Sequence, residues 1–374
     1  MKKHKTEVET MADTRKKSPA RTVLKIVISV ILALIIIVLA YLAYVLIAYH
    51  RIDDNVSLDV SGNADRIIEA GEEYTLISYN IGFAAYTPDF GFFMDGGDES
   101  RAASRESVLN VMDGITGFLS QNDADIYVIE EVDFDSDRSY HVDEREIIEN
   151  SLVGYSRVFA QNYDSPYLFY PFTCPHGASK SGILTLSKFP ITSSLRRSLP
   201  IEESLMKLVD LDRCYSVSRI PAPDGKELVV FSAHLSAYTS DGKVSTEQVK
   251  MLVSEMQAEY EKGNYVIAAG DFNKDLIGKG SEVFGVKNQD CTWALPLPDG
   301  IFDGTNISLS VPFDENDPVP SCRNADGPYN PEQYVITPDG FIVSDNITVT
   351  SSEVMDMGFI YSDHNPVRLT FILD

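Results

Sequence analysis

Residues 266–275 read VIAAGDFNKD and join a short apolar run directly to a carboxylate and an amide. The first four residues have the composition of a buried strand, and Gly270 leads without a spacer into Asp271 and Asn273. Aspartate and asparagine most often form a turn after a strand, because their side chains bond the nearby backbone. By itself, therefore, this stretch fits either a turn or the edge of an active site.

Other predicted strands also end in polar groups. LISYN ends at Asn80, DIYVIEE at Glu130 and Glu131, and LVVFSAH at His234, while SDHNP places Asp363 and His364 before the last strand. Each of these residues alone has an ordinary explanation as a turn or loop residue. Turns have no reason to choose two histidines, an asparagine and several acids at five strand ends. The set therefore predicts a functional site.

Hydrophobic periodicity predicts the elements that carry these residues. Residues 104–121 and 246–260 have apolar side chains at helical spacing and are predicted to be surface helices with one buried face. The predicted strands are 74–79, 126–129, 182–186, 215–220, 228–233, 265–269, 341–343 and 367–372. Because strands outnumber helices, we expect two packed sheets with helices outside.

The first fifty residues predict a membrane anchor. Residues 26–49 contain no charge and are long enough to cross the roughly 30 Å hydrocarbon core of a bilayer. A cleaved signal peptide normally has a shorter apolar run of about 7–15 residues and a small-residue cleavage site. We therefore expect a basic cytoplasmic tail at 1–25, a transmembrane helix at 26–49, a spacer at 50–72 and one domain at 73–374.

Charge indicates the orientation of the anchor and restricts the partners. Eight basic and three acidic residues precede the apolar run, so the tail carries +5 and should stay cytoplasmic. The whole chain carries −25, which leaves −30 for the part expected outside the cytoplasm. Such a charge disfavours general binding of nucleic acid, although it permits one metal-assisted phosphodiester site. The pairing of the four cysteines stays open.

The residues at the strand ends suit phosphoester hydrolysis. Mg²⁺ binds through one or two carboxylates together with water and phosphate oxygens, and Glu131, Asn80 and Asp363 offer such a site. His364 is the candidate general base, with Asp339 as the carboxylate that orients its ring. In this scheme Asp271 holds the attacking water. Two further side chains, Asn273 and His234, donate hydrogen bonds to the phosphate.

Two loops are candidates for the substrate pocket. RSYHVDERE at 138–146 supplies Arg138, and FAQNYDSPY supplies Asn162. Loops on a sheet scaffold commonly carry specificity. A solvated charged loop is the alternative interpretation of the first segment.

The motifs SYN, IEEVD, SGILTLSKFPI, FSAHL, GDFN, DGFIVSDNI and SDHNPV occur in an order that resembles the endonuclease/exonuclease/phosphatase superfamily, the DNase I-like proteins. The resemblance covers about residues 73–374. It implies a four-layer α/β/β/α sandwich that hydrolyses phosphate esters with Mg²⁺, or alternatively Mn²⁺. It also implies that Asn80 and Glu131 belong to the metal site, and that Asp339 supports His364.

The sequence departs from the family pattern at some positions. The family usually has glutamine before its metal-binding glutamate, and here that position is Glu130. Alternation along a strand puts Glu130 and Glu131 on opposite faces. Gly340 replaces the usual aromatic residue after the supporting aspartate. Arg213 stands where related nucleases place an arginine that contacts phosphate, so the resemblance makes it a substrate-binding candidate.

Together these features predict a membrane-anchored, extracytoplasmic, Mg²⁺-dependent phosphoester hydrolase. Lipid head groups or small phosphodiesters suit an acidic domain tethered near a bilayer, and a nuclease is the alternative within the enzyme class. A non-catalytic binding or receptor module on the same fold is the alternative from another class. The two classes differ in whether the catalytic residues are all present, and here they are.

Overall fold

The computed structural model describes residues 19–202, 207, 210–237, 242–286 and 295–374. The chain forms two units, residues 1–49 and 50–374. The first contains α1 (Pro19–Ala48), which begins before the predicted start at residue 26. Among the described residues, α1 is the one helix long and apolar enough to cross a membrane, a property that signal sequences share. Most of the expected basic tail and Cys291 lie outside the described residues.

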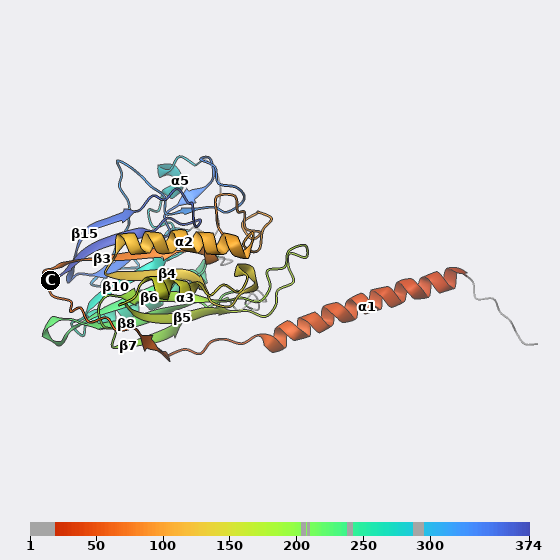
Figure 1. Cartoon of the computed structure of the whole chain (residues 1–374), viewed down its shortest axis with the longest axis horizontal. Coiled ribbons are helices and arrows are strands. Elements are labelled where there is room, and N and C mark those ends of the chain that lie inside the picture. The colour runs from red at the N-terminus through yellow and green to blue at the C-terminus, as the bar shows by residue number, and fades with distance from the viewer. Residues whose placement is uncertain (1–18, 203–206, 208–209, 238–241, 287–294) are drawn as a thin grey trace, which may run out of the picture. The chain divides into compact units, whose positions relative to one another are not determined.

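The second unit is built on two seven-stranded sheets (Figure 1). The first sheet contains, in spatial order, β1 (Val56–Leu58), β7 (Ser193–Ser198), β8 (Cys214–Pro221), β9 (Glu227–His234), β10 (Tyr265–Asp271), β14 (Asp339–Ser344) and β11 (Ile307–Ser310). The second contains β15 (Ile347–Val354), β16 (Val367–Leu373), β3 (Glu73–Asn80), β4 (Ile126–Asp133), β6 (Lys180–Ser187), β5 (Ser156–Asp164) and β2 (Val60–Ser61). A separate pair is formed by β12 (Cys322–Arg323) and β13 (Val335–Ile336).

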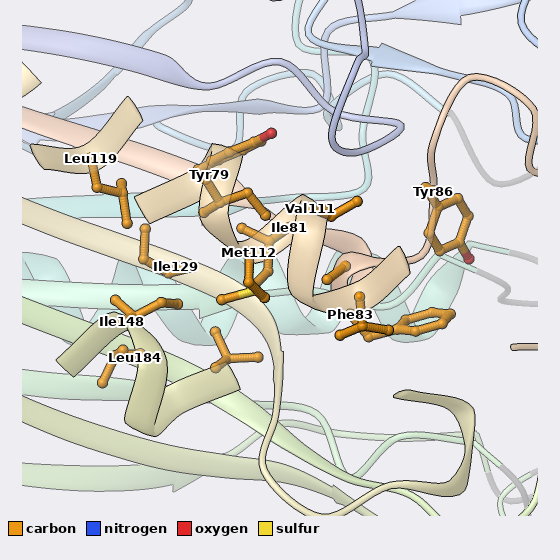
Figure 2. Packing of buried hydrophobic residues seen from close by; sticks show 14 of the residues in the cluster. Tyr79, Ile81, Phe83, Tyr86, Val111, Met112, Leu119, Ile129, Ile148 and Leu184 are labelled. Carbon is orange, nitrogen blue, oxygen red and sulfur yellow. The ribbon is translucent and has the colours of Figure 1, made fainter. Parts of the chain in front are cut away.

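Helices cover the outer face of each sheet. The α-helices of this unit are α2 (Arg105–Asn122), α3 (Glu144–Ser151), α4 (Lys243–Tyr260) and α5 (Gly280–Val283), and the short 3-10 helices include η1 (Gly82–Ala84), η2 (Asp137–Ser139) and η4 (Pro223–Gly225). Ser104 caps α2 by accepting a hydrogen bond from the backbone N–H of Ser107 at 3.1 Å. The helix α2 then packs its apolar face on β3 and β4, as Figure 2 shows around Met112 and Ile129.

Alternation along the strands separates the three cores. Leu76 and Val128 point between the sheets, where they join Val230 and Ile267 of the other sheet in one buried cluster. The neighbouring side chains point the opposite way, beneath α2 and α3, and a third cluster lies beneath α4. The order of layers is helix, sheet, sheet, helix. The predicted four-layer sandwich is confirmed.

The structure contains all the predicted strands and both predicted surface helices. It also contains strands that the periodicity did not indicate, among them β5 (SRVFAQNYD) and β7 (SSLRRS), both of which contain many polar or charged residues. Part of segment 50–72, which we expected to be a spacer, contributes β1 to one sheet and β2 to the other. This segment is therefore part of the folded unit rather than a free linker.

Candidate active site

The register of the strands brings the predicted residues to one edge of the sandwich. In the first sheet, His234 pairs with Asp271 across β9 and β10, and Asp271 pairs with Asp339 across β10 and β14. In the second sheet, Asn80 pairs with Glu130 across the parallel strands β3 and β4. Because the ends of parallel strands meet at the same edge, residues far apart in the sequence become neighbours.

Three side chains from different elements converge on one oxygen of Asp271. Asn80 Nδ2 donates to Asp271 Oδ2 at 3.2 Å, and His234 Nε2 and His364 Nε2 lie 3.6 Å and 3.8 Å from the same atom. The other oxygen, Oδ1, accepts a hydrogen bond from the backbone N–H of Asn273 at 2.8 Å. Asp271 is thus the residue that links both sheets and the final loop.

His364 is held by a carboxylate on its other ring nitrogen. His364 Nδ1 lies 2.8 Å from Asp339 Oδ2, which also accepts a hydrogen bond from Ser321 Oγ at 2.6 Å. All three side chains are buried. This arrangement fixes the ring and leaves Nε2 directed toward Asp271, as a proton-transferring histidine requires.

A β-bulge in β4 distinguishes the two adjacent acids. The register between β4 and β6 shifts between Ile129 and Val132, and Glu131 has a left-handed φ of 56°. Glu131 Oε1 accepts a hydrogen bond from Asn80 Nδ2 at 3.3 Å, whereas Glu130 is fully buried and accepts from Ser78 Oγ at 2.8 Å. The bulge therefore directs Glu131 to the site and leaves Glu130 in the interior.

The donor set fits a hard divalent cation. Glu131 and Asp363 are only partly buried. Burial raises the pKa of Asp363 and the nearby charge of Glu131 adds to this shift, so the two carboxylates lie close together. Asn80 binds Glu131 through its amide nitrogen, while its Oδ1 accepts from the backbone N–H of Gly82 at 3.0 Å. Two carboxylates with room for water and a phosphate oxygen match the preference of Mg²⁺. In this arrangement Asn80 orients Glu131.

A second group of acids lies deeper. One carboxylate oxygen or ring nitrogen from each of Asp271, Asp339 and His364 lies within 4.8 Å of the others. The sulfur of Cys322 forms a second such group with Asp363 and His364. These groups share His364, whose ring is already engaged by Asp339. His364 is therefore less available as a metal ligand than the carboxylates of Glu131 and Asp363.

Burial shifts the proton affinities in this cluster. It raises the pKa of Asp271 to about 7, with the charge of His364 opposing the shift and that of Asp339 adding to it. Burial alone would lower the pKa of His364, but the carboxylate of Asp339 and its other neighbours hold that pKa well above its ordinary value. Burial and the nearby charge of Arg213 lower the pKa of His234 well below its ordinary value. The cluster thus contains a neutral histidine and a carboxyl group that titrates near neutrality.

Several buried polar atoms beside His234 lack partners among the described residues. They are Nδ1 of His234, Nε and Nη1 of Arg213, and both side-chain polar atoms of Asn162. Asn162 and Arg213 are adjacent through the backbone, because the N–H of Asp212 donates to the carbonyl of Asn162 at 2.7 Å. Leaving a buried polar group unpaired costs about 1–3 kcal/mol. These atoms therefore indicate where a phosphate group would be received.

Arg138 has a different environment from the one expected of a pocket residue. Its Nε and Nη2 donate to the two carboxylate oxygens of Asp133 at 3.0 Å and 2.7 Å, and its guanidinium lies 3.9 Å from the ring centroid of Phe83. The side chain is buried. Its role in substrate binding remains a prediction, and the contacts give it a structural role in holding η1 and β4 together.

Two residues of the site, Ser321 and Ser362, were not anticipated from the sequence, and for Gly270 the sequence did not indicate the backbone role. Ser321 lies in a segment rich in proline and glycine, and it donates a hydrogen bond to Asp339. Ser362 Oγ donates to the carbonyl of Asn80 at 2.8 Å and accepts from the N–H of His364 at 3.2 Å. Gly270 has φ 144°, and a Cβ there would lie 1.8 Å from the carbonyl oxygen of Ala233. Only the context S-D-H-N-P hinted at one of them, Ser362.

The fold and the site together define a hydrolase of phosphoric esters. A profile of the Endonuclease/Exonuclease/phosphatase family matches residues 77–364, and the chain belongs to this family. It is therefore a metal-dependent phosphoric ester hydrolase. The resemblance given by the sequence motifs is confirmed.

Solved structures with the same fold are distant in sequence. An endonuclease/exonuclease/phosphatase from Beutenbergia cavernae is 16% identical with a TM-score of 0.53, covering 80% of this chain and 72% of its own. ANGEL2, a 2′,3′-cyclic phosphatase solved with adenosine-2′,3′-vanadate, is 15% identical with a TM-score of 0.54, covering 85% and 99%. A family member from Leptotrichia buccalis is 12% identical with a TM-score of 0.50, covering 80% and 99%. Among curated proteins no sequence matches.

Proposed function

We propose that this chain is a membrane-anchored, extracytoplasmic hydrolase that uses Mg²⁺ to cleave a phosphoester with water. The observation that carries the proposal is the convergence of Asn80, His234 and His364 on one oxygen of Asp271, with Asp339 holding the histidine ring. Burying such a cluster costs free energy, because its acids and histidines must be desolvated together. A buried cluster of this kind is therefore a candidate functional site.

In the proposed reaction, the pair of His364 and Asp271 takes the proton of the attacking water. Asp339 keeps the ring in one orientation, so that its Nε2 faces Asp271. The phosphate lies between this pair and the unpaired atoms of His234 and Arg213, and Asn273 supports Asp271 through its backbone N–H. When bound at Glu131 and Asp363, Mg²⁺ would neutralise phosphate charge and lower the pKa of the neighbouring His364.

The substrate and location are proposed from charge and from α1. The residues after the apolar run carry a net charge of −30, which repels polyanions. This charge favours a lipid head group or a small phosphodiester as substrate over DNA or RNA. The basic residues before α1 support a cytoplasmic N-terminus. The domain would then lie outside the cytoplasm, tethered to the membrane.

The test is an assay of the full-length chain in detergent with Mg²⁺, Mn²⁺ or EDTA. The substrates are DNA, RNA, sphingomyelin, phosphoinositides and bis(p-nitrophenyl) phosphate. We expect metal-dependent turnover of a lipid or small diester, with losses of about 10²-fold or more in His364→Ala and Asp271→Ala. Lys250→Ala, in an exposed lysine of α4 that binds Glu247, is the control and should keep full activity.

Three results would contradict the proposal in different ways. Absence of turnover on every substrate would favour the receptor or binding module. Full activity in EDTA, or in the two variants of the site, would remove the assigned chemistry. Preference for DNA or RNA would retain the chemistry and replace the substrate class.

A further inference from the structure

We propose that residues 165–177, the aromatic loop, dock on the lipid bilayer that holds α1 and so place the active site at the level of the lipid head groups. The loop joins β5 to β6. The inference rests on the anchored enzyme proposed above and adds to it a specific surface of contact. It names as partner the apolar and interfacial layer of the membrane itself.

The loop exposes large apolar rings to solvent. Phe169, Tyr170 and Phe172 are 50%, 60% and 84% exposed, and Tyr170 packs edge to face on Phe172 with ring centroids 5.8 Å apart. The ring of Phe93 contacts Tyr170, and the next residue, Met94, is 44% exposed. A contiguous exposed apolar patch of this kind indicates an interaction site in a soluble domain.

Hydrogen bonds at the base of the loop hold its backbone in place while the aromatic rings remain exposed to solvent. His176 is buried, and its Nδ1 lies 2.8 Å from the carbonyl oxygen of Ser100. Arg101 Nε donates to the carbonyl of Pro175 at 3.1 Å, and Leu168 and Gly177 form a backbone bridge. The exposure of the rings is thus set by buried hydrogen bonds at the base of the loop.

Chain connectivity puts this loop beside the exit of α1. His50 Nε2 lies 3.3 Å from Asp164 Oδ2, and Asp164 is the residue directly before the aromatic loop. Only Tyr49 separates His50 from the end of α1 at Ala48, so two peptide links of about 3.8 Å each limit the distance between them. Whatever the orientation of α1, an anchor ending at Ala48 keeps the base of the loop near the bilayer surface.

The same end of β5 forms the substrate side of the site. Asn162, with its unpaired side chain, lies two residues before Asp164, and its carbonyl binds the N–H of Asp212. Asp212 also accepts a hydrogen bond at 2.7 Å from Nε of Arg51, a residue that follows shortly after the end of α1. Anchor exit, aromatic loop and phosphate-receiving atoms therefore share one end of the domain.

The chemistry of the loop selects a lipid surface over other partners. Residues 165–177 contain no acidic residue, lysine or arginine, and the rest of the domain is strongly acidic. Nucleic-acid paths interleave aromatics with basic residues, which this loop lacks. Tyrosine and phenylalanine rings suit the boundary between head groups and acyl chains. Attraction to anionic lipid is not needed, so zwitterionic phosphatidylcholine should suffice.

The direct test measures the depth of the loop in the bilayer. The full-length chain, with its single Trp293 changed to phenylalanine, receives Phe172→Trp, and a matched chain receives Val153→Trp. Val153 is 82% exposed and precedes the opposite end of β5. Both chains are reconstituted in phosphatidylcholine vesicles with brominated acyl chains, which quench tryptophan at the interface.

We expect at least about twofold quenching of the tryptophan at 172 and almost none at 153, because interfacial residues lie roughly 5–10 Å into the head-group boundary. Absence of quenching at 172, or equal quenching at both positions, would overturn the proposal. The first of these results would favour a protein partner over the bilayer as the surface that these rings contact.

A second test separates docking from catalysis. Phe169→Ser/Phe172→Ser should lower hydrolysis of a phosphoester lipid in the same bilayer by about tenfold, since each lost ring removes apolar contact. It should leave turnover of soluble bis(p-nitrophenyl) phosphate unchanged, and Val153→Ser should affect neither. Equal loss on both substrates would assign the rings a structural role. If the unmutated chain cleaves neither substrate, the proposed function fails, while the quenching result still decides the loop.

Discussion

Asp271 is the residue on which the geometry of the site depends most. Its Oδ2 is approached by Asn80, His234 and His364, which come from a different strand or loop in each case. Burial raises the pKa of Asp271 to about 7. At neutral pH this carboxyl group is therefore close to the point at which it changes from hydrogen-bond donor to acceptor.

This pKa predicts the pH dependence of catalysis. The carboxylate form is needed to accept a proton, and the raised pKa means that the group is protonated below about 7, so kcat/KM should fall about tenfold per pH unit below that point. Profiles from pH 5 to 9 on a soluble diester measure this. Asp271→Asn should lower the rate by about 10²-fold or more and remove this limb. A flat profile for the unmutated chain would contradict the role.

Arg213 should show opposite effects on stability and activity. Its buried Nε and Nη1 have no partner among the described residues, so Arg213→Met should raise the free energy of unfolding by about 1 kcal/mol. The same change should lower kcat/KM on a diester by about 10²-fold, because a phosphate would lose its cationic partner. Urea unfolding and steady-state kinetics measure the two effects.

Arg323 provides the matched control for Arg213. It is also buried, but its Nη2 donates to the carbonyl of Thr87 at 3.1 Å. Arg323→Met should therefore destabilise the fold. Destabilisation by Arg213→Met of the same size would show that Arg213 is a structural residue.

At the scale of elements, one buried carboxylate of α4 joins this helix to its sheet through several hydrogen bonds. Glu259 near the end of α4 accepts hydrogen bonds from Arg219 of β8 at 2.6 Å and from Asn264 at 2.9 Å. Burial would raise the pKa of Glu259, but these bonds and Lys262 outweigh it and lower the pKa to about 2. The depressed value means that the folded state favours the charged form.

The resulting stability depends on pH in a defined direction. Stabilisation by Glu259 is complete above its unfolded pKa of about 4.3 and is lost as pH falls from there toward 2. Glu259→Gln should thus lower the free energy of unfolding by about 2 kcal/mol at pH 7 and by much less near pH 3. Urea unfolding at both pH values measures this. The exposed Glu261→Gln should change it by less than about 0.5 kcal/mol, and a pH-independent effect of Glu259→Gln would refute the linkage.

At the scale of the whole molecule, the question is how the acidic domain is held. The helix α1 has the length and composition of a membrane span, and the first residues after it bind the domain directly: Arg51 and Ile52 both bind Asp212. In the anchored enzyme proposed above, this short connection would leave the domain little freedom to move away from the membrane surface. The domain would search for substrate in two dimensions.

Fractionation of the cell tests this anchoring. The full-length chain should remain in the membrane pellet after an alkaline carbonate wash and enter solution only with detergent, because 24 uncharged residues do not leave the hydrocarbon core. Protease added to intact cells should remove the domain. A soluble mature chain that begins after residue 49 would instead identify α1 as a cleaved signal sequence.

The sequence by itself determined most of the long strands, including those buried on both faces, and it predicted most residues of the candidate site. LISYN, VIAAGD and their counterparts are mostly apolar before their polar ends, so their local composition was sufficient. Polar residues at the ends of these strands drew attention as a set, because turns alone do not require histidines and acids at five strand ends. Partners within a few residues of a strand end, such as His364 and Asp363, therefore emerged from the sequence alone.

The tertiary structure decided what depends on distant pairing. Whether Glu130 or Glu131 faces the site depends on a bulge, because one extra residue in a strand reverses the direction of every following side chain. Ser321 reaches Asp339 from a loop without periodicity. The contact of His50 with Asp164 joins residues far apart in the chain. Local composition fixes which residues are apolar or polar, but only the packed sheets fix which of them meet.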